Sequence, residues 1–183
     1  IVFTDSVERK LYTEKDDFAA VYPFIPYQFN LLGSVLTAIR THGASGKHLS
    51  EGERSMLAMF KESAVAYMHE QQGTIIPFYA FYTPMENFLD HSHRSVIIKA
   101  YENDYINPDH KTGDVFAINV LKTLFLIKYV QDMTPNVDNI TTLMMDNLEE
   151  DRITLKGNVE EALKVLIRQM LVQKNGSVYV FLT

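Results

Sequence analysis

Residues 115–130 read VFAINVLKTLFLIKYV, and this stretch decides the fold. A helix formed here is apolar on almost every side, which is typical of a helix in the centre of a domain. Lys122 and Lys128 interrupt the stretch, and it is shorter than the roughly 20 residues that a membrane span needs. The sequence therefore predicts a buried central helix.

Two more helices and a hairpin are predicted after this stretch. Thr134-Pro135 opens the first helix, with Thr134 as its cap and Pro135 in its first turn, and that helix runs to about Asn147. Gly157-Asn158 precedes the second helix. Asn175-Gly176 stands between short apolar runs, which is the strongest short hairpin signal in a sequence.

Three helices followed by a hairpin is the order of a winged helix-turn-helix module. The sequence therefore predicts a mainly α-helical chain that ends in a winged-helix-like part with a C-terminal β-hairpin. A three-helix bundle with an accessory hairpin is the alternative, and its architecture differs little.

Upstream of the central stretch the sequence predicts a helical part. A helix is expected over 27–40, with Pro26 in its first turn and the glycines of 43–46 after its end. Ser50 and Glu53 have the spacing of a capping box for the next helix, which is expected to extend as far as Gly73. Residues 74–84 are rich in aromatic side chains and fit either a short strand or a buried loop. A third helix is predicted over 85–101.

Asn107-Pro108-Asp109 and Gly113 mark the clearest boundary in the chain. We therefore predict a connector over 1–22, a helical domain over 23–112 and a winged-helix-like domain over 113–183. Since the chain starts at Ile1 and ends in what reads as a strand, we expect it to be an internal piece of a larger protein.

Composition restricts the chemistry. The 183 residues contain no cysteine, which excludes a disulfide framework, a cysteine nucleophile and thiolate metal sites. Seventeen Lys and Arg against 23 Asp and Glu give a net charge of −6, which argues against a protein that coats nucleic acid. Without a signal peptide or a membrane span, the sequence favours the cytoplasm.

Several short motifs do not reach a catalytic or metal pattern. The segment 43–48, GASGKH, lacks the first glycine and the final Ser or Thr of a phosphate loop, and it follows a helix instead of a strand. His91 and His93 are two residues apart, so on a helix they lie on different faces. A solvated or capping role is expected for both, and no metal site is predicted.

Arg54 lies near the start of a predicted helix, outside its apolar stripe. A cation at this end of a helix is mildly unfavourable, so Arg54 is a candidate to face an anionic partner. An ordinary surface arginine is the alternative.

A winged-helix module would contact DNA through its third helix and its hairpin, here with Lys164, Arg168 and Lys174. From residue 113 onward, however, seven Lys and Arg stand against nine Asp and Glu, a net charge of −2. The alternative is therefore a module that packs against protein.

Several long strings are similar to the large P-loop ATPases of bacterial BREX phage-defence systems, the BrxC or PglY family. They are spread over about residues 20–183 and read YPFIPYQF (22–29), GKHLSEGERS (46–55), VLKTLFLIKYV (120–130), NITTLM (139–144), QKNG (173–176) and FLT (181–183). Strings of this length are far more specific than a short motif.

The resemblance implies a non-catalytic fragment of a cytoplasmic AAA+-type ATPase, with its Walker motifs upstream. It implies ATP and Mg²⁺ for the whole protein but no cofactor in this fragment. The implied partners are the upstream ATPase core, other BREX subunits and DNA, and an oligomeric parent protein is compatible with the resemblance. By analogy with related ATPases, residues 23–112 would form a helical lid, with Arg54 and Lys47 as nucleotide-sensing residues.

Overall fold

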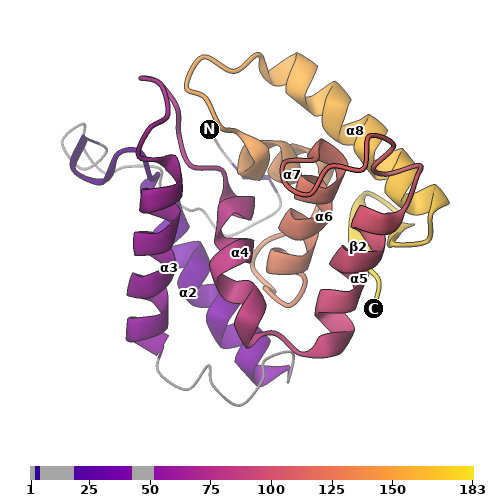
Figure 1. Cartoon of the computed structure of the whole chain (residues 1–183), viewed down its shortest axis with the longest axis horizontal. Coiled ribbons are helices and arrows are strands. Elements are labelled where there is room, and N and C mark those ends of the chain that lie inside the picture. Colours follow the sequence, from indigo (N-terminus) through magenta and orange to yellow (C-terminus); the bar gives the residue numbers. More distant parts are fainter. Residues whose placement is uncertain (1–2, 5–18, 43–51) are drawn as a thin grey trace.

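The computed structural model describes residues 3–4, 19–42 and 52–183, with the backbone alone described at 52–54. Helices make up most of this part of the chain, and a two-stranded antiparallel sheet lies at its C-terminal end (Figure 1). The prediction of a mainly helical chain with a C-terminal hairpin is confirmed. The elements are α2 (Pro26–Thr41), α3 (Gly52–Tyr67), η1 (Phe78–Phe81), α4 (Tyr82–Met85), η2 (Glu86–Phe88), α5 (His91–Glu102), α6 (Phe116–Ile127), α7 (Val137–Met144), α8 (Arg152–Arg168), β1 (Val172–Asn175) and β2 (Val178–Phe181).

Helix α6 lies in the middle of the molecule, as its sequence predicts. It contacts α4, α5, α7, α8, η1 and β2, so its side chains are covered from nearly every direction. Phe125 is 1% exposed and meets the rings of Tyr82, His93 and Phe181, with centroids 5.4–5.8 Å apart. Burial on all sides explains why this helix lacks the polar face of a surface helix.

The hairpin packs against the helices that precede it. β1 contacts α8 and β2 contacts α6. Asn175 faces Val178 in the register, so Gly176 and Ser177 form the turn, one residue later than the Asn175-Gly176 pair of the sequence prediction. Gly176 has a φ of +63°, a conformation that glycine adopts without steric cost. On its other edge β2 meets the segment before α7, through the Asn136–Val178 bridge and the Tyr179 N–H, which donates to the Pro135 carbonyl at 3.0 Å.

Aromatic rings join α2, α3 and η1 in the other half of the chain. The ring of Phe60 is stacked on Phe29 at 4.3 Å and meets Phe24 and Phe81 edge-on at 4.9 and 5.0 Å. Buried Gln28 joins two segments, because its Oε1 accepts from the Ile25 N–H and its Nε2 donates to the Ile76 carbonyl. Pro26 stands at the start of α2, which confirms its predicted place.

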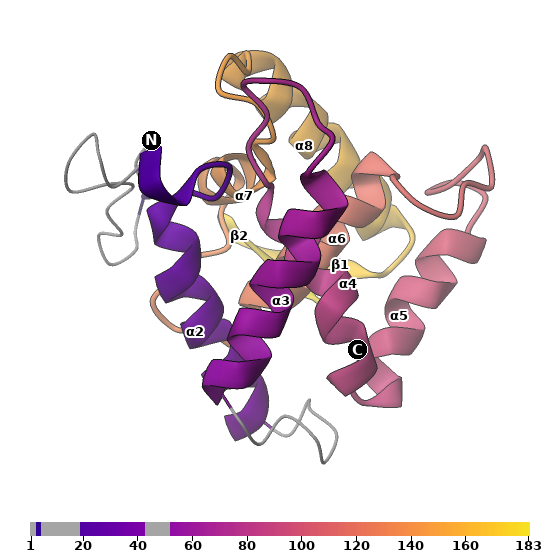
Figure 2. The same cartoon turned by 60° about the vertical axis from the view of Figure 1, so that its left-hand side comes forward.

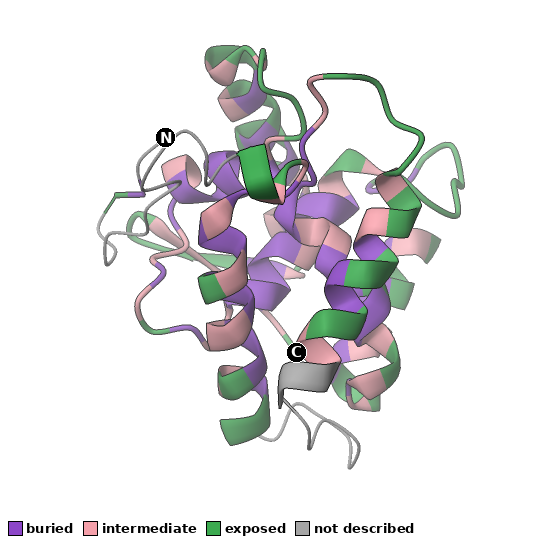
Figure 3. Ribbon diagram, turned by 90° about the vertical axis from the view of Figure 1, so that its left-hand side faces the viewer, coloured by how far each residue is buried: buried purple, intermediate pink, exposed green. Residues whose placement is uncertain are grey.

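Buried residues from both halves form one cluster, which includes Phe3 and Leu31 as well as Val159 and Phe181. In Figure 3 these residues gather along the inward faces of the helices, and exposed residues lie along the outer faces. The predicted boundary near residue 112 therefore falls in a surface loop between two elements that share one core.

Three predicted helix starts were wrong, and in each case an Asx side chain caps the helix elsewhere. Asp90 accepts the His93 N–H, so α5 begins at His91 and not at Met85. Asn136 accepts the Asn139 N–H, so it replaces Thr134 as the cap of α7. Asp151 accepts the Ile153 and Thr154 N–H groups, so α8 begins five residues before Gly157. Such side-chain caps satisfy N–H groups that a helix start leaves free.

Two further boundaries differ from the prediction. The aromatic run 74–84 is neither a strand nor a plain loop, because Phe78–Met85 forms the short helical turns η1 and α4. Helix α3 ends at Tyr67, before Gly73, and α7 ends at Met144, before Asn147. The proposed capping box and the glycines of 43–46 fall at least partly outside the described residues.

We expect the substitution Phe125→Ala to lower the free energy of unfolding by about 3–5 kcal/mol, because it opens a cavity among buried rings. Phe116→Ala on the same helix is the matched control, since Phe116 is 38% exposed, and it should cost less than about 1 kcal/mol. Urea denaturation of both variants measures the difference. Equal losses would contradict the central position of α6.

Candidate functional site

A groove lies between the start of α7, one face of α8 and the hairpin. Its volume is about 630 Å³. Side chains from all three elements line it, together with Thr4 of the N-terminal segment: Asn136, Val137, Asp138, Lys156, Glu160, Leu163, Lys164, Ile167, Lys174, Ser177 and Tyr179.

The structure brings together two of the three predicted DNA-binding residues. Lys164 of α8 and Lys174 of β1 both line the groove, whereas Arg168 is exposed but does not belong to its lining. Lys156 joins them, and sequence reasoning missed it. The signal was present, because Lys156 lies eight residues before Lys164 and so shares its helix face once α8 begins at Arg152.

Each lysine of the groove already interacts with a neighbouring side chain, which is a carboxylate in two cases and an aromatic ring in the third. Lys156 Nζ lies 3.0 Å from the Asp138 carboxylate, and Lys164 Nζ lies 2.9 Å from that of Glu161. Lys174 lies over the ring of Tyr179, 5.7 Å from its centroid. The groove is therefore mildly attractive to anions, and it is not a strongly positive surface.

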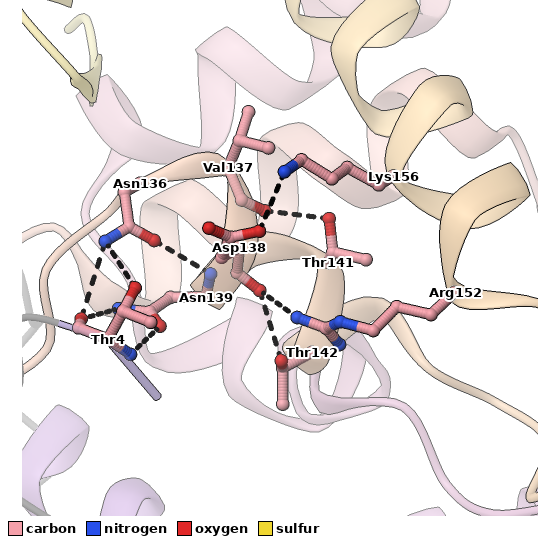
Figure 4. A network of polar contacts seen from close by, with 9 residues as sticks. All are labelled: Thr4, Asn136, Val137, Asp138, Asn139, Thr141, Thr142, Arg152 and Lys156. Atoms are coloured by element: carbon pink, nitrogen blue, oxygen red, sulfur yellow. Dashed lines mark hydrogen bonds and ion pairs between the residues drawn. The ribbon is translucent and has the colours of Figure 1, made fainter. Parts of the chain in front are cut away.

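Polar contacts fix α7 at the end of the groove (Figure 4). The buried Asn139 amide accepts the Thr4 N–H at 2.8 Å and donates to the Thr4 carbonyl at 2.7 Å, so both polar groups of the amide bind the Thr4 backbone. Asn136 also donates to the Thr4 hydroxyl at 3.1 Å. Part of the predicted connector 1–22 is thereby attached to the last part of the chain.

Further contacts in Figure 4 tie α8 to α7. Arg152 Nη2 donates to the Asp138 carbonyl at 3.0 Å, and the Asp138 side chain pairs with Lys156. Two elements that line the groove are thus held together by charged hydrogen bonds as well as by apolar contact.

The N-terminal end of α8 is acidic. The Asp151 carboxylate accepts from the Thr154 hydroxyl and from two backbone N–H groups, and these hydrogen bonds lower its pKa. Before it, partial burial and the neighbouring Asp146 carboxyl, which shares a hydrogen bond, raise the pKa of Glu150 to about 7. Leu148 and Ile153 are exposed beside these carboxylates.

The predicted nucleotide-sensing residues are not described in atomic detail. Lys47 and the whole segment 43–48 lie outside the described residues, and Arg54 lies in the first turn of α3, where only the backbone is described. Their proposed role therefore stays a prediction.

Of the two roles expected for His93, solvated or capping, the structure places it at the capped start of a helix. It is buried, its Nδ1 lies 2.6 Å from Asp90 Oδ1, and its Nε2 lies 2.9 Å from the Tyr129 hydroxyl. It therefore takes part in the capped start of α5, while His91 is exposed. Over the described ranges, no group of three or more His, Asp or Glu side chains is placed to hold a metal ion.

The chain matches no protein-family model, and no solved structure matches it. Within the part of the chain that the structure describes, no helix is both long and apolar enough to cross a membrane.

We expect the stability of the chain to fall between pH 5 and pH 8 through Glu150. A glutamate in an unfolded chain titrates near pH 4.3. Between that pH and about 7, Glu150 therefore binds a proton in the folded chain but not in the unfolded chain. Because the folded chain binds more protons, its free energy of unfolding falls as the pH rises through this range.

Urea denaturation of the chain and of Glu150→Gln at several pH values measures this effect. The variant should lose less stability than the unsubstituted chain from pH 5 to pH 8. Glu149→Gln, the exposed neighbour, is the control and should retain the full decline. Parallel curves for the chain and Glu150→Gln would show that Glu150 titrates as a free carboxyl.

Proposed function

We propose that this chain is a non-catalytic part of a BREX-type P-loop ATPase and that it couples nucleotide state to DNA or to a partner subunit. The proposal rests on the long strings that resemble this family, several of which fall on buried or capped elements. NITTLM contributes Asn139 and the five other buried residues of α7, and LKTLFLI forms most of α6. ATP and Mg²⁺ would bind to the upstream core.

A winged-helix-like arrangement of residues 113–183 is the structural side of this proposal. The observation that carries it is the bridge between Asn136 and Val178, because it adds the segment between α6 and α7 to the hairpin. With this single bridge the 136 segment lies beside β2, on the edge opposite to β1 of the two-stranded sheet. In a winged helix, a segment before the second helix pairs with the wing in the same way.

The lid-like role of residues 23–112 is proposed on the same resemblance. It is supported by the shared core, because η1, α4 and α5 all contact α6. A displacement of the first half by nucleotide would therefore act on the element against which the hairpin and α8 pack. Arg54 and Lys47 are the residues proposed to sense the nucleotide.

DNA contact is proposed through the groove lysines, which would face phosphates. It would be weak, because Lys156 and Lys164 already lie beside carboxylates and the acidic Asp138 and Glu160 belong to the same lining. Contact of this kind follows the backbone and does not read base sequence.

We expect the double variant Lys164→Ala/Lys174→Ala to weaken binding to a 30-base-pair duplex. Each phosphate contact that is lost should reduce the slope of log K against log salt by about 0.9, so the slope should fall by close to 2. Fluorescence anisotropy between 50 and 200 mM salt measures both quantities. Arg168→Ala, exposed on the same helix but outside the groove lining, is the control and should change binding less.

Tight binding that the double variant leaves unchanged would contradict the groove as the DNA-binding surface. Absence of binding at 50 mM salt would favour the second candidate, a protein-docking module. A specific observation supports that candidate: Ile153 at the start of α8 is 86% exposed and Leu148 is 48% exposed, and the exposed Glu149 and Asp151 stand between them in the sequence. Exposed apolar side chains with an acidic rim suit a protein surface better than a phosphate backbone.

A further inference from the structure

A second concave site lies in the other half of the molecule, between α3, α4, α5 and α6. Helix α4 contacts both α3 and α6, and α5 contacts α6 (Figure 2). The cavity has a volume of about 790 Å³. Sites for small organic molecules commonly occupy about 300–1,000 Å³. No lining residue is shared with the groove.

The described side chains that line this cavity are strongly biased in charge. Lys122 is the single basic residue among them. The acidic ones come from four separate segments: Glu62, Glu70, Glu86, Asp114 and Asp146. A ligand that gains from this lining must itself be positively charged.

Lys122 demonstrates how the walls accommodate an ammonium group. Its Nζ donates to the Tyr101 hydroxyl at 3.0 Å and lies 5.3 Å from the ring centroids of both Tyr82 and Tyr101. A cation within about 6 Å of a ring centroid is attracted by the ring. The tyrosines of the cavity therefore already form a cage for one primary ammonium.

Two other tyrosines of the lining, Tyr67 and Tyr79, are influenced by nearby carboxylates, and among the described residues no Lys or Arg lies over either ring. Tyr67 and Tyr79 share a hydrogen bond, and burial is the main cause that raises the pKa of both. Asp114 and Asp146 raise both pKa values further, that of Tyr67 to about 12. Their hydroxyls thus stand in a region of negative potential, which favours a positively charged hydrogen-bond donor.

Two buried hydroxyls in the wall lack partners. Ser63 and Tyr82 are each 2% exposed, and neither Ser63 Oγ nor Tyr82 OH has a hydrogen-bond partner in the described structure. Buried polar atoms are nearly always hydrogen-bonded. Both oxygens are themselves buried, so the N–H groups of a ligand could reach them as acceptors only if the adjoining side chains moved.

We propose that this cavity binds an organic ammonium ion, an aliphatic polyamine in particular. Asp114 and Asp146 would pair with its ammonium groups, and the tyrosine rings would cover its methylene segments. The carboxylates are spread along the lining, and in the described part of the chain no three acidic or histidine side chains converge as a metal site requires. A spread of carboxylates fits an extended polycation better than a compact divalent ion.

The test is isothermal titration of the full 183-residue chain with spermidine at constant ionic strength. We expect saturable binding, weakened about tenfold or more by Asp146→Asn, because the substitution removes a charged hydrogen-bond partner. Asp114→Asn should act in the same direction. Glu149→Gln removes the same charge from an exposed position outside the lining and should leave the affinity unchanged.

Asp114 also accepts a hydrogen bond from Asn119 at 2.6 Å, so circular dichroism must show that its variant is folded. If that variant fails to fold, Asp146→Asn decides, because Asp146 is exposed. A lysine-containing peptide forms a second arm. If only spermidine binds, the ligand is a free polyamine. If both bind, the cavity recognises ammonium groups in general, and the lysine side chain of another protein is a second source of that group.

Two results would overturn the proposal. One is equal affinity of Asp146→Asn and Glu149→Gln for spermidine. The other is complete competition by Mg²⁺ at an equal concentration of charge, which would mean that the acidic surface merely collects counterions. Neither result bears on the groove, so failure here leaves the proposed function untouched.

Discussion

Helix α6 has to be covered on every side, and the rest of the structure follows from that requirement. An exposed apolar helix of this kind would leave a large hydrophobic surface in water, so α4, α5, α7, α8 and β2 all pack against it. Its few polar groups are satisfied locally: Thr123 Oγ1 donates to the Asn119 carbonyl at 2.8 Å, and Asn119 donates to Asp114. The elements packed around α6 form the walls of both concave sites. The cavity lies among α3, α4, α5 and α6, and the groove lies among α7, α8 and the hairpin.

The two concave sites differ in how they are held. Polar contacts between α7 and α8 shape the groove, and its lysines are balanced by nearby carboxylates. Tyrosines and spread carboxylates shape the cavity, where Lys122 of α6 is the sole basic residue of the described lining. One helix thus contributes to the cavity wall and also packs against α7, α8 and β2, which line or flank the groove.

Sequence periodicity predicted the central helix, the hairpin and the first turn of α2, because each depends on local pattern or on a residue with a fixed conformational preference. It misplaced the starts of α5, α7 and α8, because several Asx, Thr and Gly residues compete for each cap and only the folded backbone selects among them. Lys156 was missed as a consequence of the misplaced start of α8. The cavity was beyond prediction, since its lining comes from segments between residues 62 and 147 that only tertiary packing brings together.

Native-state hydrogen exchange tests the central role of α6 most directly. The amides of Leu121–Phe125 should exchange only through global unfolding, with the same free energy that urea denaturation gives for the whole chain. The amides of α2 and α8 should exchange with an opening free energy that is equal or lower. Exchange of the α6 amides through an opening of lower free energy, while α7, α8 and the hairpin stay protected, would contradict the account.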